Sequence, residues 1–304
     1  MILNVVNETA RLKTVVLGQP YSLGKEPTPE ETYDAKSYET VLKGVYPTEE
    51  DIASEMTAFE QVLLKYDVEV LRPLILPNSN QVFARDVAFV IDDKIITSNI
   101  IPDRADEQEA YAPIYSEIAF NKIYNLPEKA HVEGGDVVLH NEIIFVGTYM
   151  EHDYPEYKTA RTNAYAVAFL KELFPEKTFI ALELEKSDTD PRKGILHLDC
   201  TFMPVGNDKA IIYKDGFRNE KDYQLLIEMF GKDNIFEVTQ EEMYYMNTNV
   251  FSISPEVIVS EKRFTRLNNH MRDIWGLTVE AIPYYEISKM GGLLRCSTLP
   301  LVRE

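Results

Sequence analysis

The sequence predicts an α/β fold in which one structural unit occurs five times and the chain closes on itself. Amphipathic helical patterns begin near residues 50, 106, 158, 220 and 263, and each is followed by a short break and a strand-like run. Pairs of apolar, β-rich runs lie between these helix and strand phrases. A spacing of about 50 residues, found five times, indicates one repeat architecture. We therefore expect a single domain over residues 1–304.

The first and last helices are the clearest, because apolar residues recur in them at intervals of three or four. These residues are Ile52, Met56, Phe59, Leu63 and Tyr66 in the first helix, and Phe264, Leu267, Met271 and Ile274 in the last. Pro113 falls within the second helical pattern. It should kink or shorten that helix, because its ring clashes with the preceding turn.

The expected strands are short runs rich in β-branched and aromatic residues. After the five helices these runs are DVEVLRPL, AHVEGGDVVL, KTFIALEL, NIFEVT and LTVEAIPY. The paired runs are VAFVI with KIITSNI, TFMPV with KAIIY, and VFSIS with EVIVS. The region of residues 20–49 has no clear period and is rich in proline and mixed charge. We interpret it as a long ordered loop with a short helix, and as a surface excursion in preference to a lid over the site.

The composition bounds the partners of the protein. A net charge of −19 argues against a nucleic-acid backbone or an anionic membrane, because either would require a basic face. This charge suits a cationic small molecule, but an acidic surface that serves only solubility is the preferred interpretation. The N-terminal residues contain neither a basic leader nor a long apolar run, so we expect no signal peptide and no membrane span, and a cytoplasmic location.

Two cysteines, Cys200 and Cys296, are too few for a disulfide framework. No CxxC or HExxH spacing suggests a metal site, so we expect neither a metal nor a cofactor. The segment ILHLDC is predicted to be a strand, which would place His197 and Asp199 on one face and Cys200 on the other. Because a free cysteine is most often a small buried hydrophobe, Cys200 is expected in the core.

Four clusters of polar residues lie at strand ends or in the turns beside them, where a rigid scaffold presents side chains to a cavity. They are FARDV, VEGGDVV, ILHLDC and GGLLRCST. Their polar members are Arg85 and Asp86, Glu133 and Asp136, His197 and Asp199, and Cys296. Each has a structural alternative when taken singly, such as a capped turn or surface ion pair for FARD and a solvated glycine turn for EGGD.

The setting of Cys296 favours a role in chemistry. Gly291 and Gly292 permit close approach of a substrate, and the charge of Arg295, if it lies near the sulfur, would favour a thiolate. Together the clusters offer a thiol, an imidazole and four carboxylates. A peptidase has no use for four acids beside a cysteine and a histidine, whereas a planar guanidinium cation donates several hydrogen bonds to carboxylates. The residues thus indicate cysteine chemistry on a guanidino compound.

In this order the motifs resemble those of the guanidino-group modifying enzymes, which include arginine deiminases, dimethylarginine dimethylaminohydrolases and amidinotransferases. The resemblance extends from RLKTVVLG near the N-terminus to RCSTLPLV at the end of the chain. It implies a pentein fold, a five-bladed α/β propeller of ββαβ repeats with pseudo-fivefold symmetry. It also makes a homodimer an expectation.

Carried over position by position, the resemblance gives each motif a role. FARD makes Asp86 a guanidinium-binding carboxylate. HLD makes His197 the general acid and base, and Asp199 a second guanidinium ligand. Cys296 stands at the position of the nucleophile, and EGGD supplies Glu133 and Asp136 as acidic site residues, with Glu133 assisting catalysis and Asp136 contacting the substrate.

The resemblance also suggests contacts with the rest of the substrate. Asn80 lies six residues before the Asp of FARD, as in deiminases. Arg104 and Arg161 stand where the family often has arginines, and they either bind a substrate carboxylate, which would select arginine over agmatine, or lie on the surface. The chain departs from the family pattern at Met290, where deiminases commonly have arginine, and at Arg295, where histidine is common.

The reaction implied is hydrolysis of the guanidino group of arginine or a related compound. It would pass through a covalent thiouronium on the cysteine and give citrulline and ammonia from arginine. Two alternatives stay open. HLDCTFMPV and MNTNVFSI look closer to amidinotransferases, which would move the amidino group to an amine such as glycine. A protein that kept the propeller but lost catalysis would only bind a guanidino compound, although the nucleophile and its partners are all present.

Overall fold

The strands of the protein form five small sheets of three strands each. The computed structural model describes all residues, 1–304. The sheets are β15-β1-β2, β3-β4-β5, β6-β7-β8, β9-β10-β11 and β12-β13-β14. In every sheet the middle strand is antiparallel to one neighbour and parallel to the other. The predicted fivefold repeat is therefore confirmed.

The strands are short, and a helix or helical turn precedes the parallel strand of each sheet. Their bounds are β1 Leu12–Leu17, β2 Glu69–Leu71, β3 Ala88–Ile91, β4 Lys94–Thr97, β5 Ile123–Asn125, β6 Val137–His140, β7 Ile143–Thr148, β8 Thr178–Glu183, β9 Phe202–Val205, β10 Lys209–Ile212, β11 Ile235–Glu237, β12 Phe251–Ser254, β13 Val257–Glu261, β14 Thr278–Ile282 and β15 Thr298–Arg303. The three predicted strand pairs are confirmed as the antiparallel pairs β3-β4, β9-β10 and β12-β13.

The helices also follow the predicted order, with differences at their ends. Their bounds are α1 Ala35–Leu42, α2 Glu49–Lys65, α3 Ala112–Ser116, α4 Ala164–Leu173, α5 Glu220–Phe230, α6 Gln240–Tyr244, α7 Thr265–Asp273 and α8 Tyr285–Ser288. The helix expected near residue 106 is mostly a run of 3-10 turns, Pro102–Tyr111, and Pro113 lies in the first turn of the short α3. Ile274 is the C-cap of α7 and is 70% exposed, so the helical pattern extends one residue beyond the helix.

Two predicted strand segments are turns instead. Only the end of AHVEGGDVVL forms a strand, β6, because Gly134–Asp136 is a 3-10 turn. In ILHLDC the residues Leu198–Cys200 form a second 3-10 turn before β9. There the backbone N–H of Leu198 donates to the Asp136 carboxylate at 2.9 Å, so a side chain takes the place of a strand partner.

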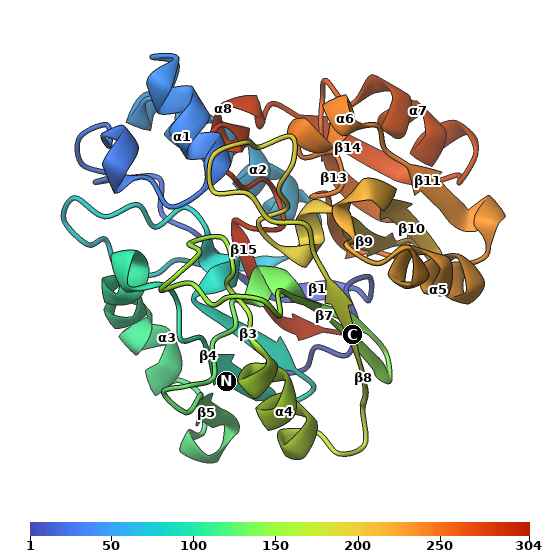
Figure 1. Cartoon of the computed structure of the whole chain (residues 1–304), viewed down its shortest axis with the longest axis horizontal. Helices are drawn as coiled ribbons and strands as arrows, with labels where there is room; N and C mark the ends of the chain where they lie inside the picture. The colour runs from blue at the N-terminus through green and yellow to red at the C-terminus, as the bar shows by residue number, and fades with distance from the viewer.

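The two ends of the chain close the ring. β1 and β15 pair antiparallel over most of their length, and in Figure 1 the blue β1 and the red β15 lie near the centre of the molecule. The chain runs around them in sequence order, with α3, α4, α5 and α7 at the periphery (Figure 1). The sheet β15-β1-β2 contains strands from both ends of the chain. The ring of five sheets therefore closes only when β1 and β15 have paired.

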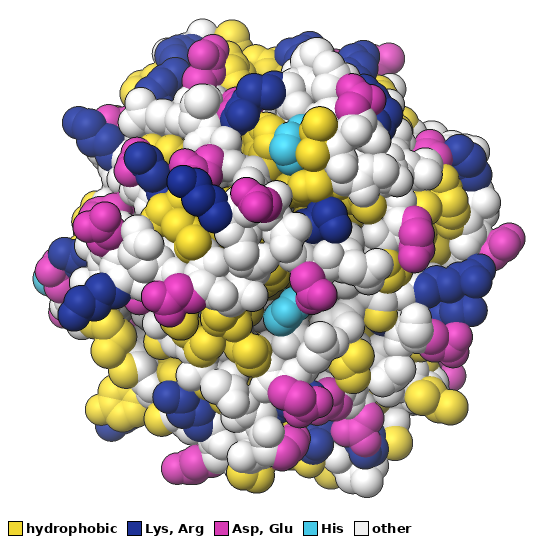
Figure 2. Space-filling view, turned by 90° about the vertical axis from the view of Figure 1, so that its right-hand side faces the viewer, with side chains coloured by type: hydrophobic (Ala, Val, Ile, Leu, Met, Phe, Trp, Pro, Cys, Tyr) yellow, Lys and Arg dark blue, Asp and Glu magenta, His cyan; other side chains and the backbone are white.

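The charge of the surface and the length of the helices are relevant to the partners expected from the sequence. On the face beside α5, acidic and basic side chains are interspersed, and no continuous basic area is seen there (Figure 2). None of the helices combines the length and the apolarity that crossing a bilayer requires.

The region of residues 20–49 is fixed onto the propeller by α1, which lies at the upper left of Figure 1. The Nζ atom of Lys36 donates to the Tyr244 carbonyl at 2.9 Å and lies 3.0 Å from the centre of the Tyr244 ring. Glu39 accepts a hydrogen bond from Arg192 at 2.9 Å, and the Thr40 hydroxyl donates to the Lys289 carbonyl at 2.9 Å. The preferred interpretation as a surface excursion is therefore wrong for α1, which these contacts hold against other parts of the propeller, while residues 24–26 and 30–31 are exposed.

Candidate active site

The sequence motifs converge because each precedes the first strand of a different sheet. Ala84–Asp86 precedes β3, Gly134–Asp136 precedes β6 and Leu198–Cys200 precedes β9. Turns at residues 245–248 and 294–297 precede β12 and β15 in the same way. The fold therefore brings five segments distant in sequence to one end of the propeller.

Glycines let these turns touch. A Cβ on Gly134 would lie 2.1 Å from the Arg85 carbonyl oxygen, and one on Gly135 would lie 2.6 Å from Nδ1 of His197. Neither distance is compatible with a side chain, so the EGGD glycines pack one turn against the next. The glycines therefore help to position the His197 imidazole. The alternative of a glycine turn that is only exposed to solvent is wrong.

Gly291 and Gly292 line a small cavity beside Cys296. A Cβ on Gly291 would lie 2.4 Å from Oδ1 of Asp34, and one on Gly292 would lie 2.4 Å from the Phe83 ring. Gly291 also has a φ of +84°, which side chains rarely tolerate. The expectation that these glycines make room for substrate needs correction, because the space is filled by Asp34 and Phe83.

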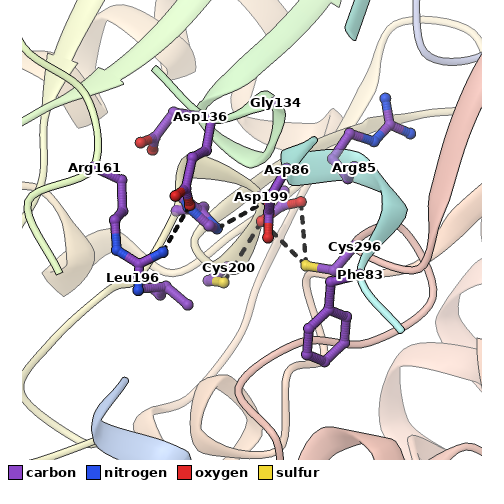
Figure 3. A network of polar contacts seen from close by, with 12 residues as sticks. Phe83, Arg85, Asp86, Gly134, Asp136, Arg161, Leu196, Asp199, Cys200 and Cys296 are labelled. Carbon is purple, nitrogen blue, oxygen red and sulfur yellow. Dashed lines mark hydrogen bonds and ion pairs between the residues drawn. The ribbon is translucent and has the colours of Figure 1, made fainter. Parts of the chain in front are cut away.

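The Cys296 thiol is buried, with 2% of the residue exposed. Its Sγ lies 3.2 Å from Nδ2 of Asn249 and 3.6 Å from Oδ2 of Asp199. Figure 3 shows that Cys200 and Cys296 both point toward the Asp199 carboxylate. A hydrogen bond with Cys200, burial and this carboxylate raise the pKa of the Cys296 thiol well above its usual value. The free site therefore holds a neutral thiol.

Arg295 does not favour a thiolate, contrary to expectation. Its Nη1 bonds Oδ2 of Asp199 at 2.8 Å, and its Nη2 bonds Oε1 of Glu8 at 2.8 Å and the Val137 carbonyl at 2.7 Å. The guanidinium is fully buried and its charge is balanced by two carboxylates. Arg295 therefore links the cysteine turn to Glu8, to Asp199 and to the start of β6 at Val137.

Two carboxylates favour the protonated form of the His197 imidazole. Its Nε2 lies 2.8 Å from Oε2 of Glu133, and its Nδ1 lies 3.7 Å from Oδ1 of Asp86. Burial alone would lower the pKa of His197, but these carboxylates raise it to about 9. Burial would raise the pKa of Glu133, but the Arg161 guanidinium at 2.7 Å and His197 hold it well below its usual range. The pair is thus an imidazolium and a carboxylate at neutral pH.

Arg104 and Arg161 are not surface arginines. Both line the cavity, with 5% and 1% of each residue exposed. Arg104 bonds Asp86 at 2.7 Å and holds Glu107 through two nitrogens, at 2.6 and 3.0 Å. These ion pairs place Arg104 beside Asp86 and Arg161 beside Glu133, and binding of a substrate carboxylate by the two arginines stays a prediction.

The other predicted site residues lie behind or outside the cavity. Asp136 accepts hydrogen bonds from the Thr162 hydroxyl at 2.7 Å and from a turn N–H, so it supports the HLDC turn. Asp199 touches the sulfur of Cys296 but does not line the cavity. Asn80 donates to the Tyr33 hydroxyl at 3.3 Å and lines an outer cleft. Cys200 is buried in the core as predicted, while its sulfur also contacts Asp199 at 3.6 Å.

Asn249 belongs to the site, although none of the motif roles included it. Its Oδ1 accepts the backbone N–H groups of Arg295 at 3.0 Å and Cys296 at 3.2 Å, while its Nδ2 faces the sulfur. The signal was the repeat itself, because MNTNV precedes the paired runs VFSIS and EVIVS as FARDV precedes VAFVI and KIITSNI. Asn249 therefore fixes the backbone of the cysteine turn.

The cavity is small. Its volume is about 10 Å³, and its lining includes Cys296, His197, Asp86 and Asp34. An outer cleft of about 1080 Å³ shares Tyr33, Arg104 and Met290 with it. A guanidinium group does not fit the inner volume, so side chains must move apart to admit it. The cleft is lined by seven carboxylates and two cationic side chains, a balance that attracts cations.

A cluster of three side chains beside the cavity has ligand atoms at metal-binding distances. The imidazole of His197 and the carboxylates of Asp86 and Glu133 each offer an atom, and these atoms lie within 4.8 Å of one another. Each of the two carboxylates already binds an arginine, at 2.7 Å in both cases. The cluster is therefore occupied by the cations of the chain itself, and a metal ion would have to displace them.

The charge state of His197 can be tested directly. In a proton–carbon NMR titration of the full chain, one imidazole should titrate near pH 9, and this signal should be missing in His197→Gln. Glu133→Gln should move it to lower pH, because the carboxylate that favours the imidazolium is lost. An unmoved signal in that variant would contradict the assigned pair.

A propeller whose turns gather a thiol, an imidazole and carboxylates around one cavity places the protein among the guanidino-group modifying enzymes, the pentein superfamily. The model of the family described as N,N dimethylarginine dimethylhydrolase, eukaryotic, matches residues 30–303, and the chain belongs to this family. The predicted superfamily is confirmed.

Two relatives illustrate the range of the family resemblance. The protein YkgA of Bacillus subtilis (strain 168) is 29% identical over 246 residues, which cover 80% of this chain and 77% of that protein. An arginine deiminase of Clostridium perfringens is 25% identical over 276 residues, which cover 75% of this chain. The match covers 62% of the deiminase, so the chain spans less than two thirds of its length.

Solved structures show the same fold at low identity. An amidinotransferase, SxtG of Microseira wollei, superposes with a TM-score of 0.74 at 19% identity, covering 99% of this chain and 97% of that one. The N-terminal domain of ArgZ, a cyanobacterial arginine dihydrolase, superposes with a TM-score of 0.77 at 15% identity, covering 95% and 97%. The predicted five-bladed propeller is thus confirmed.

Proposed function

We propose that the protein is a cysteine-dependent hydrolase that acts on the guanidino group of arginine or an N-methylated arginine. The observation that carries the proposal is that Cys296 and His197 line the same cavity. The carboxylate of Asp86 in this cavity and the acidic side chains of the outer cleft favour binding of a cation. The family, which is named for dimethylarginine, and the arginine deiminase and dihydrolase among the similar proteins support the same substrate class.

In the first half of the reaction, the cysteine displaces a nitrogen. The guanidinium cation beside Cys296 favours loss of the thiol proton to water, because an opposite charge lowers the pKa of a thiol. The sulfur then bonds the guanidinium carbon. The imidazolium of His197 gives its proton to the departing nitrogen, the carbon–nitrogen bond breaks, and a thiouronium remains on the cysteine.

In the second half, water replaces the sulfur. Neutral His197 takes one proton from the attacking water, while Glu133 at 2.8 Å holds the ring in place. The carbon–sulfur bond then breaks as the remaining proton of the added water passes to the sulfur, so that a carbonyl forms and Cys296 leaves as a thiol. His197 keeps the first proton and is again an imidazolium. Arginine would give citrulline and ammonia, and an N-methylated arginine would give citrulline and a methylamine.

A substrate screen tests the proposal. The full chain is incubated with arginine, N-methylated arginines, agmatine or guanidinoacetate, and citrulline, ammonia, methylamines and ornithine are measured. We expect citrulline from arginine or a methylated arginine without any added amine. Ornithine that forms only when glycine is added would contradict the hydrolase and establish amidino transfer. No turnover of any compound would favour a binding protein.

A further inference from the structure

Asp34, in the region of residues 20–49, has one carboxylate oxygen with a structural role and one without. Oδ1 caps α1, because it accepts the backbone N–H of Lys36 at 2.9 Å and of Ser37 at 2.8 Å. Oδ2 is buried and has no hydrogen-bond partner. Only 4% of the residue is exposed, so water does not replace the missing donor.

Capping does not explain the second oxygen. Serine and asparagine cap helices as well as aspartate and bring no net charge into a buried place. A buried carboxylate oxygen without a donor costs free energy, because it loses its hydration and receives nothing in return. Such a group in a native structure indicates that a donor is supplied from elsewhere.

The position of Asp34 indicates where the donor comes from. Asp34 lines the same cavity as Cys296, His197 and Asp86. Two other polar atoms at this cavity, Oδ1 of Asp86 and Nδ1 of His197, face each other at 3.7 Å and are too far apart for a hydrogen bond. The glycine at 291 is required there, because a Cβ would come within 2.4 Å of the Asp34 carboxylate. The cysteine loop is thus shaped to hold this carboxylate beside the nucleophile.

We propose that Oδ2 of Asp34 accepts a hydrogen bond from a cationic nitrogen of the substrate, so that the residue capping α1 is also a substrate-binding residue. The nature of the substrate rests on the proposed function. An amino-acid substrate of this class carries two cations, the guanidinium and the α-ammonium, and both have N–H groups that suit a carboxylate. Binding would also stabilise α1, because the same side chain serves both.

The test separates capping from binding. Asp34→Asn and Asp34→Ser retain a capping oxygen and remove the charged second oxygen. Binding of arginine is measured by calorimetry in the full chain carrying Cys296→Ser, so that no turnover interferes. We expect affinity to fall about 10- to 100-fold in both Asp34 variants. Far-ultraviolet circular dichroism should be unchanged, since the cap is retained.

A matched control removes a charge from the same region. Glu30 is exposed and lines neither the cavity nor the cleft, so Glu30→Gln should keep its arginine affinity within twofold. A second ligand, 4-guanidinobutyrate, lacks the ammonium. Loss of affinity for both ligands places Asp34 on the guanidinium, and loss for arginine alone places it on the ammonium. Unchanged affinity for both ligands in both Asp34 variants would overturn the inference.

Failure of this inference differs from failure of the proposed function. If the unmodified chain hydrolyses a guanidino compound while its KM is unchanged in Asp34→Asn, the hydrolase stands and the role of Asp34 is refuted. If arginine binds through Asp34 but the unmodified chain turns over no guanidino compound, the role of Asp34 stands and the hydrolase is refuted.

Discussion

Replacing Cys296 with alanine should reduce kcat for the guanidino substrate by at least about 10⁴-fold, because no thiouronium can form without the sulfur. The loss is measured as citrulline and ammonia released per enzyme. Acid quenching of the unmodified enzyme during turnover, followed by mass spectrometry, should show an adduct on the peptide containing Cys296. Both signals should vanish together in Cys296→Ala.

The second cysteine supplies the matched control. Cys200 has the same chemistry and lies in the neighbouring turn, but it does not line the cavity that Cys296 lines. We expect Cys200→Ala to keep kcat within about tenfold and to form the same adduct. Full activity in Cys296→Ala, or an adduct that maps to Cys200, would refute the assignment of the nucleophile.

Replacing Arg295 with methionine should lower the free energy of unfolding by about 3 to 5 kcal/mol. The change removes one partner from a buried charge network and leaves the carboxylates of Glu8 and Asp199 without their guanidinium. Urea unfolding followed by circular dichroism measures the loss. Activity should fall as well, because Arg295 shares the turn of Cys296 and bonds the carboxylate beside its sulfur.

Two further variants make this measurement specific. Arg272→Met is the same substitution on the exposed face of α7 and should change stability by no more than about 0.5 kcal/mol. In a double-mutant cycle, Glu8→Gln combined with Arg295→Met should cost less than the two single losses added together, because each change removes the same interaction. A loss of unfolding free energy below about 1 kcal/mol in Arg295→Met would mean that the buried ion pairs of Arg295 stabilise the protein no more than a surface ion pair does.

Periodicity was a reliable guide to the fold because it reflects burial. Helix α2 forms where apolar residues recur at helical spacing, and Ile52, Met56 and Phe59 in it are fully buried. The predicted pairs of strands form because short polar turns join runs of β-branched residues. Errors occur where tertiary contacts replace local ones, as in the turn Leu198–Cys200, whose N–H group is bonded by the side chain of Asp136.

The site was predictable to the extent that its chemistry is visible in residue types. Cys296, His197, Asp86 and the EGGD acids were identified because a thiol, an imidazole and carboxylates stand out at strand ends. Asn249 was missed, because an amide has no conspicuous chemistry and its role is to bond the backbone of a segment 46 and 47 residues away. The partners of these residues and their protonation could not be read from the chain.

The sequence by itself determined the repeat, the order of its helices and strands, and the reactive groups, because apolar spacing and side-chain chemistry are properties of the chain. Tertiary structure decided which charges face one another. It placed Arg295 against Glu8 and Asp199, it buried Cys296 beside Cys200 and Asp199, which raise the pKa of its thiol, and it brought Asp34, the N-cap of α1, to the cavity. Burial and distance set the energy of a charge, and both arise only when the five sheets close into a ring.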